Sequence, residues 1–158
     1  MTGDARFEDG AERPLRLMAV TAEDLQVLSA LVQDAVMPVT EMRWDRARRR
    51  FAVLVNRFRW EDRAAADRMG RPYERVQAVL SVEDVQQVAS QGFDRGDRDL
   101  VLSLLSVSFE PGTDGGGRVV LTLAGDGAIA LDVECLEVTL NDVTRPYTAP
   151  SGKAPQHP

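Results

Sequence analysis

TAEDLQVLS, at residues 21–29, is nearly repeated sixty residues later as SVEDVQQVA, at residues 81–89. In the first copy Thr21 and Asp24 form the Ser/Thr-x-x-acid pattern that is typical of a helix start. The apolar residues that follow at helical spacing are Leu25, Leu28, Leu31 and Val32. We therefore predict an amphipathic helix over residues 22–33, with one buried stripe.

The second copy carries the same pattern at Ser81 and Asp84, and Gly92 follows it where a helix often ends in a left-handed residue. Its valines, unlike the leucines of the first copy, recur at a strict i+3 spacing. These valines are Val82, Val85 and Val88. The spacing favours a short helix or a 3₁₀ helix over residues 82–91, and a strand is the alternative.

Runs of β-prone sequence surround both copies in the same order. The runs are LRLMAV (15–20), AVMPVTEMRW (35–44) and RRFAVLVNRFRW (49–60) around the first copy, and YERVQAVL (73–80), DLVLSLLSVSF (99–109) and GRVVLTLA (117–124) around the second. Each pass along the chain thus predicts a strand, a capped helix and a β-hairpin. Residues 61–72 form a polar connection with a possible helical turn, and GDG (125–127) predicts a tight hairpin turn.

The predicted fold is α+β and mainly antiparallel sheet, with residues 15–60 and 75–133 as two repeated strand–helix–hairpin units. The repeated phrase begins a third time near Leu131, so a closing C-terminal strand with a short helix or turn is expected. One globular domain should span residues 14–145. Flexible polar tails are expected at 1–13 and 146–158. A sandwich, a barrel and a pleckstrin-like closure remain alternatives.

Charge is distributed unevenly along the 158 residues, whose net charge is −6. Residues 41–75 hold 11 of the 19 basic side chains and six acids, or +5, which leaves eight bases against 19 acids, or −11, elsewhere. A single cysteine excludes an intramolecular disulfide. No window approaches the ~18 apolar residues of a membrane span, and the N-terminus lacks the apolar core of a signal peptide. A cytoplasmic location without membrane attachment is expected.

Several blocks resemble an uncharacterised alphaproteobacterial family that is catalogued only as a domain of unknown function. The blocks are AEDLQVLSALVQDAV (22–36), RRFAVLVNRFRWE (49–61), VASQGFDRGD (88–97), LSLLSVSFEPG (102–112) and GAIALDVECLEVTLND (127–142). They cover nearly the whole predicted domain, and NRFRWE and LDVECLE are specific. The resemblance implies a bacterial, cytoplasmic protein. It carries over no established activity, cofactor or catalytic residue.

Residue types that serve in catalysis or metal binding are few. The one histidine, His157, lies in the predicted C-terminal tail, and Cys135 ends an apolar alternation where a buried, inert thiol is expected. Together they do not make a zinc site of the usual kind. DRGDRD (94–99) lacks the residue order of a calcium loop and is interpreted as a solvated loop with local ion pairs. No catalytic residue, metal or cofactor is predicted.

The segment NRFRWE (56–61) is the main candidate for a functional surface, because arginine beside an aromatic residue is typical of binding hot spots. The candidate residues are Asn56, Arg57, Arg59 and Trp60, with Arg48 and Arg49 from the preceding turn. Alternation along the strand predicts a buried face that turns polar where the strand emerges. In the alternative interpretation the aromatic residues belong to the core, and the arginines pair with nearby acids such as Glu61 and Asp62.

These features favour a non-catalytic protein-binding or scaffold module, whose partner is an unidentified protein or a second copy of the chain. One alternative is a module that binds single-stranded RNA through the 41–75 region, although the acidic remainder would repel a long polyanion. Another alternative is a carboxylate-dependent enzyme that uses Asp94, Asp97 or Glu134. A protein partner is preferred over RNA because of this overall charge.

Overall fold

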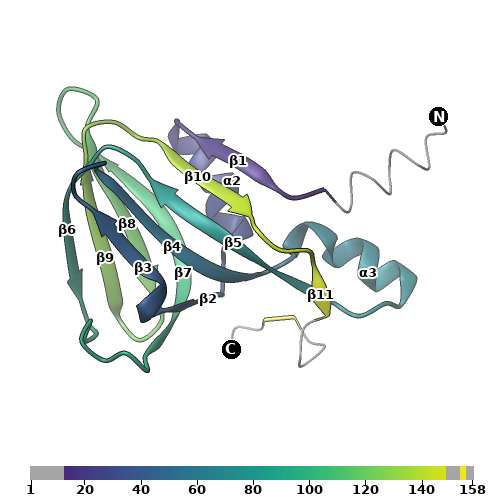
Figure 1. Cartoon of the computed structure of the whole chain (residues 1–158). Coiled ribbons are helices and arrows are strands. Elements are labelled where there is room, and N and C mark those ends of the chain that lie inside the picture. The colour runs from purple at the N-terminus through teal and green to yellow at the C-terminus, as the bar shows by residue number, and fades with distance from the viewer. Residues whose placement is uncertain (1–12, 149–153, 156–158) are drawn as a thin grey trace.

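The computed structural model describes residues 13–148 and 154–155, which form one antiparallel sheet with two short α-helices (Figure 1). The strands are β1 (Arg16–Ala19), β2 (Ala35–Pro38), β3 (Met42–Asp45), β4 (Arg50–Phe58), β5 (Glu74–Val82), β6 (Val85–Gln91), β7 (Val101–Pro111), β8 (Gly117–Leu123), β9 (Gly127–Val133), β10 (Val138–Asp142) and β11 (Tyr147–Thr148). The helices are α2 (Ala22–Leu31) and α3 (Arg63–Met69), with 3₁₀ turns η1 (Val39–Glu41) and η2 (Trp60–Asp62). Among the described residues, no helix has the length and apolar character needed to cross a membrane.

The sheet folds over into two walls. Its strand order is β1-β10-β5-β4-β2-β7-β8-β9-β6, with β3 paired to β4 and β11 paired to β5, and every pairing is antiparallel. We call β1, β10, β5, β4 and β3 the first wall, and β2, β7, β8, β9 and β6 the second wall. Strand β2 joins them, since it pairs with β4 through Val36 and Asn56 and with β7 along its length. Only Glu83 and Asp84 separate β5 from β6, so this corner also joins the two walls.

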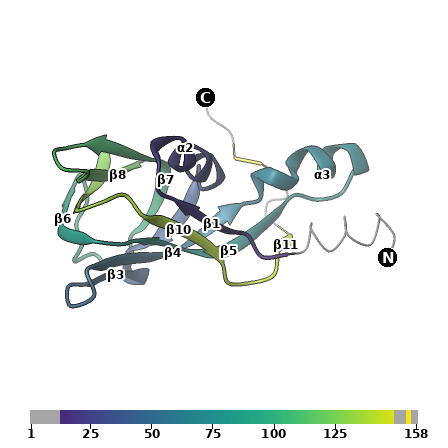
Figure 2. The same cartoon turned by 90° about the horizontal axis from the view of Figure 1, so that it is seen from above.

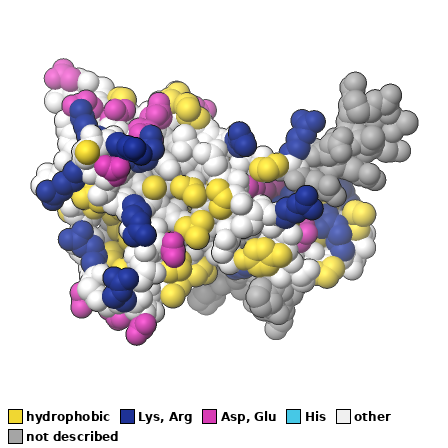
Figure 3. Space-filling view, in the orientation of Figure 1, with side chains coloured by type: hydrophobic (Ala, Val, Ile, Leu, Met, Phe, Trp, Pro, Cys, Tyr) yellow, Lys and Arg dark blue, Asp and Glu magenta, His cyan; other side chains and the backbone are white. Residues whose placement is uncertain are grey.

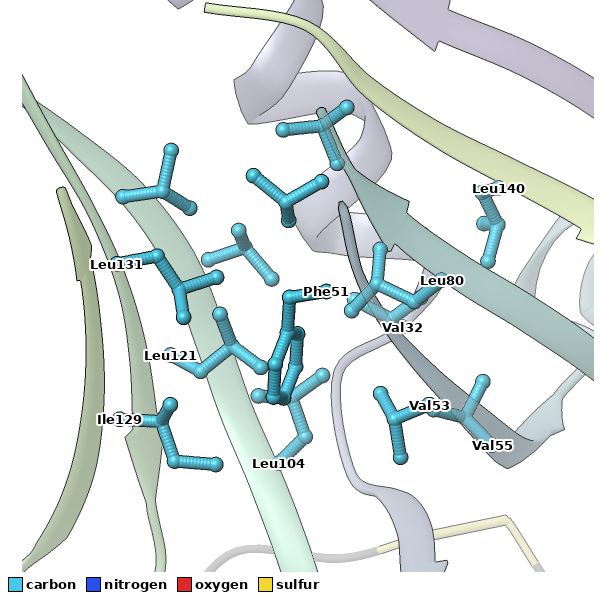
Figure 4. Close-up of a cluster of buried hydrophobic side chains, with 14 of the residues drawn as sticks. Val32, Phe51, Val53, Val55, Leu80, Leu104, Leu121, Ile129, Leu131 and Leu140 are labelled. Carbon is cyan, nitrogen blue, oxygen red and sulfur yellow. The ribbon is translucent and has the colours of Figure 1, made fainter. Parts of the chain in front are cut away.

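The hydrophobic core lies between the two walls (Figure 4). Side chains of β4 and β5 face those of β8 and β9 across it. The residues Val53, Leu80, Leu121, Ile129 and Leu131 are all at most 2% exposed. Full burial of one such side chain contributes about 1.5–3 kcal/mol, so the contact between the walls is a main source of stability.

Helix α2 begins where the sequence predicts. The Oγ1 of Thr21 accepts the backbone N–H of Asp24 at 3.1 Å, which satisfies a donor that the first helical turn leaves unpaired. The buried residues of the helix are Leu25 and Leu28. The Oγ of Ser29 accepts the N–H of Val107 on β7 at 2.8 Å, so the helix is fixed to the second wall. The predicted helix is confirmed, and it ends at Leu31.

Most predicted strands and hairpins are confirmed. The hairpins β3–β4, β7–β8 and β8–β9 form, and the last of them turns within residues 124–126. The connection over 61–72 is more helical than predicted, because it contains both η2 and α3. Helix α3 ends at Gly70, whose φ of 63° is the left-handed conformation of a helix C-terminus. The prediction of a mainly antiparallel sheet is therefore confirmed.

The predicted repeat does not appear, because its second copy contains no helix and residues 85–91 form the strand that was the alternative. Val82 ends β5 and residues 85–91 form β6. Asp84 caps no helix: its φ is 55°, and its carboxylate accepts a hydrogen bond from the thiol of Cys135 at 3.0 Å. Val82 and Val85 are both 0% exposed, on either side of the corner. Their i+3 spacing therefore comes from two strands that meet at a two-residue bend, and not from a helical turn.

The C-terminal part of the sheet extends beyond the predicted domain. Tyr147 and Thr148 form β11, which pairs with Arg75 and Glu74 of β5, inside the range that the sequence predicts to be a tail. In two views, α3 lies at the end of the molecule opposite β6 (Figures 1 and 2). The other expected tail residues that lie outside the described residues are 1–12, 149–153 and 156–158, including His157.

Candidate functional site

Arg57, a central residue of the predicted functional surface, is buried in the fold. It is 0% exposed, and its guanidinium donates to both oxygens of Glu61 at 2.9 and 2.8 Å and to both oxygens of Asp142 at 3.1 and 3.0 Å. Burial would lower the pKa of Arg57, but the hydrogen bonds to Glu61 and Asp142 outweigh it and the pKa is raised. Burial would likewise raise the pKa of Glu61, yet the hydrogen bonds from Arg57 hold it below its usual value. The charged triad is a structural element of the first wall.

Arg59 belongs to a second cluster of ion pairs. Its Nη1 donates to Oε1 of Glu74 at 2.6 Å and lies 3.8 Å from Oδ2 of Asp62. Arg71 donates to both oxygens of Asp62, each at 2.6 Å, and these bonds lower the pKa of that carboxyl. The side chain of Arg59 is only 9% exposed, so its charge is directed at acids of the same chain.

Trp60 and Asn56 also serve the fold. The indole Nε1 of Trp60 donates to the backbone oxygen of Gln33 at 3.0 Å, and its ring packs edge-on against Phe58 at 4.7 Å between centroids. The amide of Asn56 donates to the hydroxyl of Tyr147, which ties β4 to β11. The expected exposed surface with arginine beside tryptophan therefore does not form. The alternative interpretation, in which the aromatic residues pack in the fold and the arginines pair with acids, describes these residues.

Acid is expected to weaken the protein through two of these carboxylates. The pKa values of Glu61 and Asp62 are lowered from ordinary values of 4.5 and 3.8, so their contribution to stability is complete above those values and is lost as the pH falls through the lower folded-state values. The free energy of unfolding in urea should fall when the pH is lowered from neutral to below both ordinary values. This fall should be smaller in the double variant Glu61→Gln, Asp62→Asn than in the wild type. The exposed pair Glu110→Gln, Asp126→Asn is the control and should keep the wild-type dependence. Equal pH dependence for all three proteins would contradict this account.

A groove runs between β3 and β6, and we call it the β3–β6 groove. Its inner part has a volume of about 200 Å³ and its outer part about 660 Å³. The inner part is lined by Val39, Met42, Trp44, Phe51, Val88, Ser90, Phe93, Arg95 and Ile129. The outer part is lined by Trp44, Arg46, Arg49, Val85, Gln86, Gln87, Val88, Arg95 and Glu134. The shared residues make the two parts one continuous site.

The local sequence explains the apolar floor of the groove. On β3, Met42 and Trp44 are two residues apart and share the face that points to the core, and Val88 and Ser90 do the same on β6. Within the described residues β3 pairs only with β4, and β6 pairs only with β9. Because no strand joins β3 to β6, these inward side chains are half-buried instead of covered. Phe51 of β4 and Ile129 of β9 close the floor from below.

Arginine side chains surround this groove. Figure 3 shows dark blue side chains gathered on the side where β3 and β6 lie, with hydrophobic side chains between them. Arg49 pairs with Glu134, whereas Arg46 and Arg95 make no side-chain hydrogen bond or ion pair within the described part of the chain. Three arginines against one glutamate give the groove a charge of +2.

Of the six residues predicted for a binding surface, Arg49 alone lines the groove, and exposed Arg48 is adjacent to it in the β3–β4 turn. Glu134, a candidate of the enzyme alternative, also lines the outer part. Trp44 and Arg95 line the groove as well, and neither was among the residues predicted for a site. The alternation of MRWD (42–45) was a usable signal for Trp44, because it places an aromatic residue on the inward face of a short strand. No comparable signal exists for Arg95, since its position depends on how the loop after β6 folds.

The other candidate chemistries find no support in the described geometry. Cys135 is exposed, not buried as expected, and its hydrogen bond to Asp84 raises the pKa of the thiol, which disfavours the reactive thiolate. Asp94 and Asp97 accept backbone N–H groups of their own loop at 2.8 and 3.1 Å. Glu134 is held by Arg49 and by Gln86. Within the described ranges, no three His, Cys, Asp or Glu side chains are placed to hold a metal ion.

Comparison with known proteins gives one result. Neither the curated proteins nor the solved structures include a match to this chain. Residues 15–157, which include every strand and helix described above, match the family described as protein of unknown function (DUF2948). The match extends over far more than half of the chain, and the chain therefore belongs to this family of unknown function.

Proposed function

We propose that this protein is a non-catalytic protein-binding module of the bacterial cytoplasm, and that it holds its partner in the β3–β6 groove. The observation that carries this proposal is a pair of strand edges, β3 and β6, that have no strand partner on the groove side among the described residues. An unpaired edge presents backbone N–H and C=O groups, which an extended segment of another protein pairs with readily.

The floor of the groove supports a protein partner. Trp44, Phe51 and Phe93 bring three aromatic side chains to one concave site, and the adjoining rim is polar and charged. An apolar centre with a polar rim is the usual anatomy of a protein interface, and aromatic and arginine side chains dominate its binding energy. A site for general acid–base chemistry would need a titratable pair in the cavity, and the groove holds one carboxylate, Glu134, already paired with Arg49.

Photo-cross-linking in the native host tests the proposal. A photoreactive amino acid replaces Gln87, which lines the groove, or Gln26, which is exposed on α2. Position 87 should give a discrete protein adduct that position 26 does not give. The partner identified by mass spectrometry, once purified, should bind the wild-type chain and not a Ser90→Trp variant whose groove is filled.

Two outcomes would overturn the proposal. The absence of any adduct specific to position 87 would remove the groove as a binding surface. An adduct that disappears after ribonuclease treatment would favour the RNA-binding alternative, since arginines beside Trp44 also suit base stacking.

A further inference from the structure

We propose that the occupant of the β3–β6 groove is an acidic, extended peptide segment that adds a strand along β6 and inserts one aromatic side chain into the inner cavity. This inference rests on the proposed function and goes beyond it by naming the chemistry of the partner. Three independent features of the groove support it: its charge, the size of its inner cavity and the composition of its edge.

The charge of the groove selects an acidic partner. Arg46 and Arg95 are exposed and have no ion-pair partner in the described part of the chain, while Arg49 forms an ion pair with Glu134. Chain segments outside residues 41–75 sum to −11, so the arginines of the groove lie in an otherwise acidic protein. A partner with two or more carboxylates matches the local charge of +2, and a basic partner would face repulsion.

The volume of the inner cavity selects a single side chain. Its 200 Å³ lies below the ~300–1,000 Å³ of a typical site for a whole small-molecule ligand. Apart from Ser90 and Arg95, its lining side chains are apolar. Trp44, Phe51 and Phe93 offer edges and faces against which one further aromatic ring packs favourably. One large apolar side chain, carried by a segment that continues beyond the cavity, fits this space.

The edge of β6 is open to strand addition over Val88–Gln91. Natural sheets protect their edges with charged residues, proline, β-bulges or very short strands. The start of β6 is covered, because the N–H of Val85 donates to the backbone oxygen of Arg49 at 2.8 Å and the register with β9 shifts between Val85 and Gln87. Over Val88–Gln91 the sequence VASQ contains no charged residue or proline, and its pairing with β9 is regular. Val88 and Ser90 point toward the cavity while Gln87 and Ala89 are exposed, so alternate side chains of an added strand would face the floor and the solvent.

Synthetic peptides test the inference on the purified full-length chain. The probe is a labelled nine-residue peptide that alternates acidic residues with valine around a central phenylalanine. Matched peptides carry lysine in place of the acids, alanine in place of the phenylalanine, or proline at alternate positions. By fluorescence anisotropy at low salt, each replacement should weaken binding by about tenfold or more.

Variants of the protein locate the contact. Arg46→Glu, Arg95→Glu should weaken binding of the acidic peptide by about tenfold or more and strengthen binding of the lysine peptide. Arg13→Glu, Arg16→Glu changes two exposed arginines at and before β1, far from the groove in sequence and sheet order; it is the matched charge control and should leave both affinities unchanged. Ser90→Trp should abolish binding by filling the cavity. Thermal melting confirms that each variant is folded.

The outcomes separate this inference from the proposed function. Equal binding of the acidic and lysine peptides, or of the phenylalanine and alanine peptides, would overturn the inferred partner chemistry even if cross-linking at position 87 succeeds. Cross-linking with no binding of any peptide would do the same. Binding of single-stranded RNA that competes with the acidic peptide, or a dimer that Ser90→Trp dissociates, would replace the peptide with RNA or with a second copy of the chain. Failure of cross-linking and peptides together would remove both proposals.

Discussion

Replacing Arg57 with methionine is expected to destabilise the protein by about 3–5 kcal/mol, because the carboxylates of Glu61 and Asp142 then lose their positive partner at a buried site. Methionine keeps much of the volume of the side chain, so the loss reports the charge rather than a cavity. Asp142 has a side chain only 5% exposed, and Glu61 is 31% exposed, so solvent cannot fully replace the guanidinium. Urea unfolding at neutral pH measures the change.

An exposed ion pair provides the control for this prediction. Arg118 and Asp132 form a pair across β8 and β9 at 3.0 Å, with side chains 52% and 37% exposed. Arg118→Met should therefore change stability by less than about 1 kcal/mol. Neutralising the acids in the triple variant Arg57→Met, Glu61→Gln, Asp142→Asn should recover part of the lost stability. A loss at Arg57 no larger than that at Arg118 would show that the triad is not a structural element.

Gly92→Ala is expected to destabilise the protein by about 2–5 kcal/mol, for two reasons that add. The φ of Gly92 is +82°, which disfavours any residue with a Cβ by about 1–2 kcal/mol. A Cβ at this position would also lie 2.7 Å from Cα of Gly127 and 2.8 Å from the backbone oxygen of Asp126, and overpacking of this kind costs about 1–3 kcal/mol. Thermal and urea unfolding of the variant measure the total.

Gly115 separates the two contributions. Its φ is +81°, nearly the same as that of Gly92, but a Cβ there would meet no atom within 4 Å. Gly115→Ala should therefore cost only the conformational part, about 1–2 kcal/mol. Equal losses in the two variants would show that the approach of β6 to the β8–β9 turn is not tight. Because Gly92 precedes Phe93 and Arg95, the Gly92→Ala variant is also expected to disturb the inner end of the groove.

The sequence predicted those parts of the fold that depend on neighbouring residues. Helix α2 was found because a capping side chain and its apolar stripe lie within a dozen residues of each other. The hairpin turns were found for the same reason, since glycine and aspartate mark them locally. The second copy of the phrase was misassigned because a corner between two buried strands reproduces the spacing of a helical turn. Only the pairing of β6 with β9, whose paired residues lie 37 to 48 positions later, distinguishes the two.

The candidate site was harder to predict, because burial of charge depends on distant partners. Alternation correctly placed Arg57 on the face of β4 that begins with buried Phe51. That face stays buried at Arg57, since Asp142, 85 residues away, supplies a carboxylate. The β3–β6 groove has the opposite origin, because no strand among the described residues pairs with the facing edges of β3 and β6. The sequence around Arg57 does not indicate that a distant acid will pair with it, and the sequences of β3 and β6 do not indicate that their facing edges stay unpaired.

The position of Asp142 near the C-terminal end of the sheet affects when the first wall can fold during translation. Its carboxylate accepts hydrogen bonds from Arg57 and from the backbone N–H of Leu15, so one residue near the end of the last long strand joins β10, β4 and the start of β1. The chain emerges from the ribosome with its N-terminus first, and among the described residues β1 pairs only with β10. Folding of the first wall is therefore completed only after β10 has been translated, and a nascent chain that stops short of residue 142 lacks the carboxylate that Arg57 of β4 and the N–H of Leu15 share.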